Sequence, residues 1–460
     1  MTGVRKLRMA LVLGVVLNCA GCIYIGPQDT RFNAVSATID NSLEIEASSQ
    51  LLPEYNQELN QPLTVDELVS IALRDNPEIE EAKLVVESLS YKPEQALALP
   101  DPMLGTTTHL SQIQTAAGQQ DFGLAVNQKF IRQNKRLLKA QVAENEIDVA
   151  RAKLASVQQK IVEQTKNTYY ELGFVQETIS IMESDQKQLE LIDAVIDKRF
   201  RVLKDVTQQE TLQIQVAASK LRSEIDDFRR LQQSLQAKLA RLIHAAPGTQ
   251  VIAKVPASQA TLDLDFDQLL GLAIDQKPEL HAQLFEIQKN RNAAALAELS
   301  HQPDFTFGLN WILTSDDGIS PVANGRDAVM LTMGMNLPIY RDRIDAGIRE
   351  SQIRTLANTK KYERLKDETA ESITDLFVKF NIVSKNLKLF QTDIIPKQKL
   401  TLDQSLKNYE VGKTDYLQMI DNWRKLLQFQ IMEKRFKSDL QKTIVGLERE
   451  LGVISINDLR

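Results

Sequence analysis

The 460-residue sequence has few of the residues that usually carry enzyme chemistry. It contains two cysteines, both within the first 22 residues, and four scattered histidines with no second ligand at helical or strand spacing. The histidines are His109, His244, His281 and His301. Nucleophile elbows, phosphate-binding loops and carboxylate pairs with a supporting histidine are also missing. We therefore expect no metal site, no cofactor and no enzymatic activity.

Excess positive charge is missing as well. The net charge is −6 and the isoelectric point is near 5.6, whereas a nucleic-acid partner normally requires a basic face. Aromatic residues make up only 6% of the chain, which is rich instead in Gln, Leu, Ala, Lys and Glu. The charge therefore argues against a nucleic-acid partner, and the composition favours long helices and coiled coils.

The N-terminal residues have the features of a targeting segment. A short basic stretch precedes the apolar run Met9–Leu17, which is too short to span a bilayer as a mature helix. The residues Cys19-Ala20-Gly21-Cys22 that follow resemble the lipobox of bacterial lipoproteins. That resemblance implies a signal peptide over 1–21 and a lipidated N-terminal arm over 22–62, with Cys22 acylated by fatty acids such as palmitate.

Cys22 is preferred to Cys19 as the acylated residue because the bulky, polar Asn18 precedes Cys19. Ile23, rather than Asp, follows Cys22, and resemblance to lipoprotein sorting rules then implies the outer membrane. With its one remaining thiol acylated, the mature chain would form no internal disulfide. The alternative is an ordinary signal peptide that is cleaved nearby.

Two segments about 200 residues apart repeat each other. LTVDELVSIALRDNPEI begins at Leu63 and LDFDQLLGLAIDQKPEL begins at Leu264, with a constant offset of 201 residues. Later pairs, such as Tyr170 with Phe377 and Leu242 with Leu451, keep the register with offsets of 207 to 209. The sequence therefore predicts a tandem duplication, with repeat 1 over 63–250 and repeat 2 over 251–460.

Each repeat contains a stretch whose side chains alternate in polarity. These stretches lie at about 102–131 and 303–340, and the alternation is plainest in repeat 2. Its apolar face contains Phe305, Phe307, Leu309, Trp311, Leu331 and Met333. A period of two predicts β-strands, and about ten such residues suffice for a membrane-spanning barrel strand. We expect this apolar face to contact lipid; a soluble half-buried hairpin would show the same pattern.

Long helical segments follow both pairs of strands. Residues 132–198 contain no proline, and residues 341–408 contain only Pro396, where we expect a kink. Return helices are predicted over 207–244 and 415–451. In the first of these, apolar residues recur every seven positions from Ile214 to Leu242, so the long and return helices should pack as antiparallel coiled coils.

Four strands are too few to close a barrel, and open strand edges are not tolerated in lipid. Strands that cross a membrane would therefore have to be pooled between copies of the chain. Three copies would supply twelve strands, which makes a homotrimer the expected assembly.

The order of these segments, together with several motifs, resembles the TolC-like outer-membrane efflux proteins. LVSIALRDNPEI (68–79) and LLGLAIDQKPEL (269–280) look like the family's repeated opening, and LPIYRDRIDAGI (337–348) is similar to its strand-to-helix junction. RFRVLKDVTQQE (199–210) and NYEVGKTDYLQMID (408–421) lie where that family turns at its periplasmic tips.

The resemblance implies a mainly α fold with membrane β structure: a trimeric 12-stranded β-barrel, four strands per protomer, and a long periplasmic α-helical barrel. It also implies a periplasmic adaptor and an inner-membrane transporter as partners. The chain would then be the passive exit duct of a tripartite efflux pump in a Gram-negative outer membrane. Two alternatives remain open, the duct of a type I protein-secretion system and a soluble periplasmic coiled-coil scaffold.

The resemblance also implies a periplasmic gate that closes like an iris. Tyr409 matches the gate tyrosine and Gly412 the turn glycine, while Thr414 stands where some members have a basic residue. Gln418 and Asp421 match two aspartate positions, and Gln208 and Gln209 fall at the matching positions of repeat 1. Only Asp421 is charged, so three copies of it would form a weaker cation-favouring ring than two aspartates per protomer.

Overall fold

The computed structural model describes residues 63–198, 207–246, 248–253, 265–411, 413 and 415–455. All of them belong to one compact unit, Tyr55–Arg460. The predicted signal peptide, the lipidated arm with Cys22, and the tip residues Gly412 and Thr414 lie outside the described residues.

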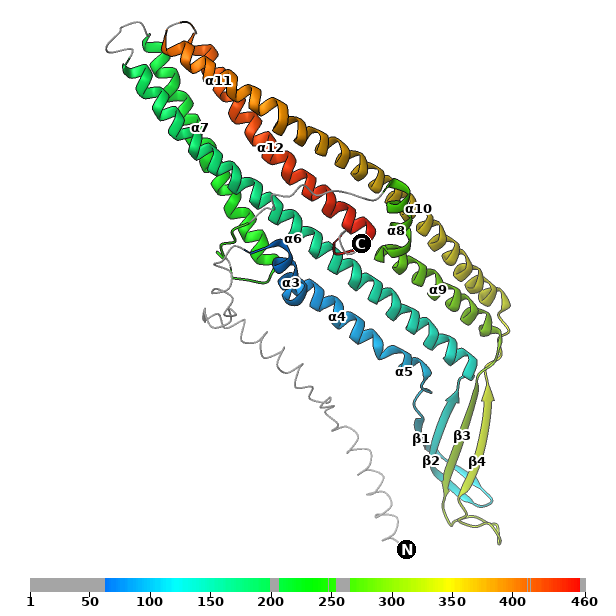
Figure 1. Ribbon diagram of the computed structural model, residues 1–460. Coiled ribbons are helices and arrows are strands. Elements are labelled where there is room, and N and C mark those ends of the chain that lie inside the picture. The colour runs from blue at the N-terminus through cyan, green and yellow to red at the C-terminus, as the bar shows by residue number, and fades with distance from the viewer. Residues whose placement is uncertain are drawn as a thin grey trace, which may run out of the picture. The chain divides into compact units, whose positions relative to one another are not determined.

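In the described part of its first half, the chain forms five helices and a β-hairpin, whose arrangement Figure 1 shows. The elements are α3 (Val65–Asp75), α4 (Pro77–Ser90), α5 (Lys92–Leu97), β1 (Met103–Thr115), β2 (Gly118–Phe130), α6 (Gln133–Lys198) and α7 (Gln208–Leu242). With 66 residues and about 1.5 Å of rise per residue, α6 extends for roughly 100 Å.

The second half repeats this order of elements. They are α8 (Phe266–Gln276), α9 (Pro278–Glu298), the 3-10 turn η4 (Leu299–His301), β3 (Phe305–Thr314), β4 (Ala328–Met335), α10 (Arg341–Leu389), the π-helical turn η5 (Phe390–Ile394), α11 (Ile395–Glu410) and α12 (Tyr416–Leu451). Within the described ranges, no helix is both long enough and apolar enough to cross a membrane.

The openings of the two halves are built alike. Thr64 caps α3 in a capping box with Glu67, and Asp265 caps α8 in a capping box with Gln268. Both helices have 11 residues, and both are followed by a helix that begins with proline. Proline suits this position because the first turn needs no intrahelical N–H donor. The local chemistry therefore fixes the same helix boundaries in both segments.

The four strands form a single antiparallel sheet in the order β1-β2-β3-β4. The two hairpins are joined by β2 and β3, which pair from Phe130 with Phe305 to Gln120 with Thr314. Strands β1 and β4 are consequently the two edges of an open sheet.

The long helices pack through apolar seams. Near the turns between long and return helices, Leu189 and Ile196 of α6 and Ile214 and Leu221 of α7 share a core cluster with α11 and α12 residues that include Tyr416. A second cluster packs α3 and α4 against α6 and the end of α7. The helix α6 lies beside α7, α9 and α12, as Figure 1 shows.

Several predicted boundaries require correction. The long helical segment expected over 341–408 with a kink at Pro396 consists of α10, the π-helical turn Phe390–Ile394 and α11, and the turn ends two residues before Pro396, which lacks a backbone donor. The strand expected to reach 340 ends at Met335, shortly before Pro338. The return helix expected to reach His244 ends at Leu242, and His244 takes a positive φ of 51°.

Candidate functional site

The first candidate site is one face of the sheet. Directly opposed residues of antiparallel strands point to the same side, and the register opposes Val126, Leu309 and Leu331 in neighbouring strands. Further positions in register extend this apolar face. They are Phe122, Leu124 and Phe130 of β2, Phe305, Phe307, Trp311 and Leu313 of β3, and Val329, Met333 and Met335 of β4. Within the chain, most of these side chains stay strongly exposed to solvent.

The opposite face of the sheet contains mainly small and polar residues. It is formed by Gly123, Ala125 and Asn127 of β2, Thr306, Gly308, Asn310 and Ile312 of β3, and Ala328, Met330, Thr332 and Gly334 of β4. Asn310 donates a hydrogen bond to the Thr332 hydroxyl at 3.4 Å. A Cβ on Gly308 would come within 2.2 Å of the Asn127 side-chain oxygen. The sheet therefore separates an apolar side from a closely packed, hydrophilic side.

Both ends of the sheet are held by polar contacts. At the helical end, Lys135 of α6 forms a 2.8 Å ion pair with Asp304, just before β3. At the far end, the indole N–H of Trp311 donates to Asp327 at 3.1 Å, and the other carboxylate oxygen of Asp327 accepts from the Thr314 backbone. The first contact joins the sheet to α6, and the second holds the far end of the β3–β4 hairpin together.

The second candidate site lies at the tips of the long helices. Tyr409 is buried there, and its hydroxyl donates to the Glu210 carboxylate of α7 at 3.3 Å. Its ring meets that of Tyr416 edge-on, with centroids 6.4 Å apart. The predicted gate tyrosine is thus placed toward α7 and α12 of its own chain.

Tyr416 is almost completely buried at the start of α12, and no partner for its hydroxyl occurs in the described part of the chain. Burial raises the pKa of this phenol to about 12. The positive charge of Arg424 opposes that rise, while Glu210 and Asp193 add to it. The phenol therefore stays protonated and keeps a hydrogen to donate within the tip.

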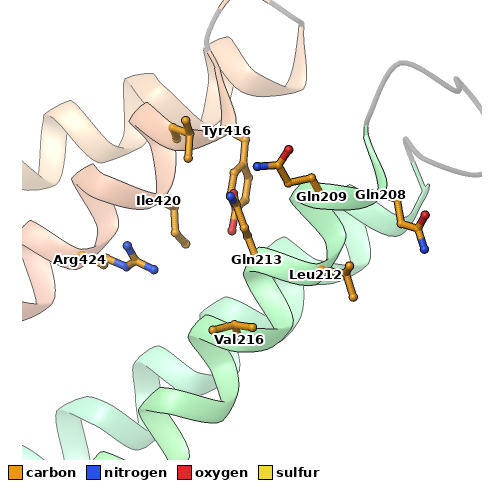
Figure 2. A pocket seen from close by; sticks show the side chains of 9 residues that line it. Gln208, Gln209, Leu212, Gln213, Val216, Tyr416, Ile420 and Arg424 are labelled. Atoms are coloured by element: carbon orange, nitrogen blue, oxygen red, sulfur yellow. The ribbon is translucent and has the colours of Figure 1, made fainter.

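An open groove of about 500 Å³ separates the starts of α7 and α12 (Figure 2). Gln208 and Gln209 line its outer end, and the exposed Leu212 and Val216 line its α7 side. Figure 2 shows Gln213 and Tyr416 reaching toward each other across it. The structure thus brings Gln208 and Gln209 to the same groove as Tyr416.

Gln418 and Asp421 occupy an exposed face of α12, one turn apart. Asp421 forms a 2.7 Å ion pair with Lys425, and both side chains are about half exposed. An exposed pair of this type contributes little to stability, but the lysine partly offsets the carboxylate's field. Any selectivity from Asp421 is therefore moderated by a cation that sequence reasoning had not assigned to the tip.

Sequence reasoning also missed Glu210 and Arg424 at the tips. Glu210 had one available signal, since it lies three residues after Thr207, the residue that caps α7. Arg424 had none, because only the packing of α12 beside α7 brings it to the groove. Among the described residues, no cluster of three or more His, Cys, Asp or Glu side chains could hold a metal ion.

Solved structures of outer-membrane channels have the same fold as this chain. The outer-membrane channel OprN matches with a TM-score of 0.72 at 14% identity, over 84% of this chain and 89% of OprN. VceC of Vibrio cholerae matches with a TM-score of 0.69 at 17% identity, over 85% and 96% of the two chains.

The open state of the Neisseria gonorrhoeae channel MtrE matches with a TM-score of 0.66 at 14% identity, over 85% of this chain and 89% of MtrE. No protein-family profile and no curated protein matches the sequence. The chain therefore shares its fold with these outer-membrane channels over 84–85% of its length.

Proposed function

We propose that this chain is the channel subunit of a tripartite efflux pump in the outer membrane of a Gram-negative bacterium. The observation that carries the proposal is the sheet register, which collects exposed apolar side chains on one face of an open sheet. Water disfavours such a face, whereas hydrocarbon solvates it, and the shared fold of outer-membrane channels supports the same conclusion.

The open sheet supports a trimer. The edges β1 and β4 leave backbone donors and acceptors that must be paired in lipid, and three chains would close twelve strands into one barrel. The small, polar face would then line the pore. The long helices would continue inward as a periplasmic helical barrel, and acylated Cys22 would anchor each chain to lipid.

The exposed face also decides against the soluble scaffold. A soluble hairpin would need a partner to cover Leu309, Leu331 and Met333, and each of them is more than half exposed. No feature of the described residues favours the protein-secretion duct. A periplasmic adaptor and an inner-membrane transporter remain the partners of the proposal, with the energy for export supplied by the transporter.

In this proposal the helix tips form the gate. Tyr409, Thr414, Gln418, Asp421, Gln208 and Gln209 are its proposed residues, with Gly412 at the turn. The contact between Tyr409 and Glu210 joins α11 to α7 and would hold the two hairpins of one chain together in the closed state. Adaptor binding would shift the equilibrium toward a state in which the tips separate.

Conductance across planar bilayers tests the proposal. Purified trimers should conduct ions, and Asp421→Asn should lower their preference for cations, by less than about twofold because Lys425 already offsets the charge. The matched Lys425→Gln variant should change the preference in the opposite direction. Folded trimers that carry no current under any condition would rule out a channel.

A further inference from the structure

A line of buried and half-buried polar side chains runs along the contact between α6 and α12, and none of them belongs to the proposed gate residues. The hydroxyl of Ser438 donates to the Tyr170 carbonyl at 3.0 Å, which fixes the register of these two antiparallel helices. Counted eight residues further toward the tips, this register places Thr178 of α6 level with Gln430 of α12. Seven more residues along each helix bring Asp185 opposite Trp423.

The line ends at the tips with Asp193 and Tyr416. Asp193 follows Asp185 by eight positions on α6, and Tyr416 precedes Trp423 by seven positions on α12. The charge of Asp193 adds to the rise in the pKa of Tyr416, which places the two side chains near each other. We call the three facing pairs, Thr178 with Gln430, Asp185 with Trp423 and Asp193 with Tyr416, the polar seam.

Helix periodicity independently places Asp185 toward α12. Eleven residues make almost three full turns, so positions 11 or 22 apart share a face. Asp185 follows Phe174 by 11 residues and Glu163 by 22. Phe174 lies under the guanidinium of Arg435 of α12, 4.8 Å from ring centre to guanidinium carbon, and Glu163 forms a 3.0 Å ion pair with Arg449 of α12. Asp185 therefore lies on the face of α6 that meets α12.

The polar seam is largely buried and poorly satisfied by protein groups. Tyr416, Trp423 and Asp185 are 1%, 4% and 7% exposed. In the described part of the chain, one buried polar atom of each of five seam residues has no hydrogen-bond partner. These atoms are Thr178 Oγ1, Asp193 Oδ1, Tyr416 Oη, Trp423 Nε1 and Gln430 Oε1. Such groups are rarely left unsatisfied, and ordered water usually completes them.

The seam contains both donors and acceptors, as bridging water requires. Trp423 and Tyr416 offer N–H and O–H donors, while Gln430 and the two aspartates offer acceptor oxygens. Met182 and Leu189 lie on either side of Asp185 along α6, and Leu221 and Ile225 of α7 belong to the same apolar cluster. Apolar side chains of α6 and α7 therefore surround the polar seam.

Several charged groups of the packed helices are paired with one another or act further along the seam. On α6 and α7, Glu183 pairs with Arg229 at 2.8 Å. On α12, Lys434 pairs with Glu177 and Lys425 pairs with Asp421. Arg424, Glu210 and Asp193 act on Tyr416 at the tip end. Burial is the cause that changes the pKa of Asp185.

We propose that the polar seam binds ordered water and that Asp185 is its titratable group, so that ionisation of Asp185 loosens the packing of α12 against α6. Protonated Asp185 needs only one acceptor and fits among these apolar side chains. The carboxylate form needs several donors, more than the seam's own N–H and O–H groups offer at Asp185, so added water must supply the rest.

Burial raises the pKa of Asp185 from its ordinary 3.8 to about 6. A raised carboxyl pKa means that the packed seam is favoured at low pH and loses stability as the pH rises through about 6. At neutral pH, the ionised Asp185 therefore weakens the packing of the hairpin α6–α7 against the hairpin α11–α12. The effect of this weakening on gating rests on the proposed function, whereas the titration of Asp185 does not.

Trp423 supplies a direct probe, because the chain contains only one other tryptophan, Trp311. In full-length protein carrying Trp311→Phe, Trp423 emission should move to longer wavelength as the pH rises through about 6. Asp185→Asn should abolish this transition. Glu183→Gln, which removes the exposed acid two residues away, should keep it.

Thermal unfolding of the otherwise unaltered chain gives a second measurement that needs no tryptophan variant. The midpoint of Asp185→Asn should exceed that of the native chain by an amount that grows as the pH rises from about 4 to about 6 and then levels off. A pH-independent Trp423 emission, or a transition that persists in Asp185→Asn, overturns the proposal.

Conductance separates the seam from the function. Channel opening that increases with pH in the native chain, but not in Asp185→Asn, supports a role in gating. A Trp423 transition with pH-independent conductance overturns that role and leaves the seam intact. A Trp423 transition in a protein that never conducts overturns the proposed function alone.

Discussion

Replacing Leu331 by lysine should prevent assembly of the proposed barrel, whereas the same replacement of its neighbour Met330 should be tolerated. Both residues are apolar, both belong to the middle of β4, and both are exposed in the single chain, by 79% and 45%. They differ in the face on which they lie. Leu331 opposes Leu309 on the apolar face, and Met330 opposes Asn310 on the small, polar face.

The expected cost follows from solvation. A lysine at the middle of a lipid-facing strand costs about 2–4 kcal/mol, and a trimer would carry that cost three times. On the pore side the ammonium group would stay in water, where no such cost arises. A soluble sheet, in contrast, would tolerate lysine at the more exposed Leu331 at least as well as at Met330.

The measurement is the fraction of protein recovered from outer membranes as a heat-modifiable oligomer in detergent. Leu331→Lys should lose most of this fraction, and Met330→Lys should retain it. Equal recovery of the two variants, or greater loss with Met330→Lys, would contradict the assignment of the lipid-facing side.

The local elements could be predicted from the sequence because their causes are local. Alternation from Phe305 to Leu313 indicates a strand whatever the strand packs against. A polar N-cap residue at the start and a proline two residues after the end set the bounds of α3 and α8. The pairing of β2 with β3 has no such signal. It joins residues about 180 positions apart, and only the packing of the helices that carry both hairpins brings them together.

The tips show the same limit. Family resemblance selected Tyr409, but its partner Glu210 and the burial of Tyr416 depend on how α11 and α12 lie against α7. Asp185 has no distinguishing sequence signal, because one carboxylate in a polar helical sequence forms no pattern. Its burial depends on the register between α6 and α12, which sequence periodicity within either helix leaves undetermined.

The largest effect on stability is expected at the ion pair between Lys166 and Glu448. It joins α6 to α12 at 2.7 Å, and the two side chains are only 5% and 8% exposed. The ammonium group of Lys166 also donates to the Ile454 carbonyl at 2.5 Å, which holds the segment after α12 against α6. Glu448→Gln would remove the negative charge and leave a buried ammonium without its counter-charge.

Removing one partner of a buried pair typically costs about 3–5 kcal/mol, because the remaining charge is neither solvated nor neutralised. Replacing both partners by apolar residues of similar volume is often neutral or even stabilising. We therefore expect Glu448→Gln to be strongly destabilised and Lys166→Met/Glu448→Leu to recover most of the loss. Chemical unfolding in a fixed detergent, followed by helical circular dichroism, measures both changes.

The exposed pair between Lys360 and Glu363 of α10 gives a matched control. Its atoms are 2.7 Å apart, as close as those of the buried pair, but its side chains are 77% and 53% exposed. Since water solvates either charge alone, Glu363→Gln should leave the unfolding transition unchanged within error. If the double variant were as unstable as Glu448→Gln, hydrogen bonding and packing specific to these two side chains, rather than an uncompensated charge, would account for the loss.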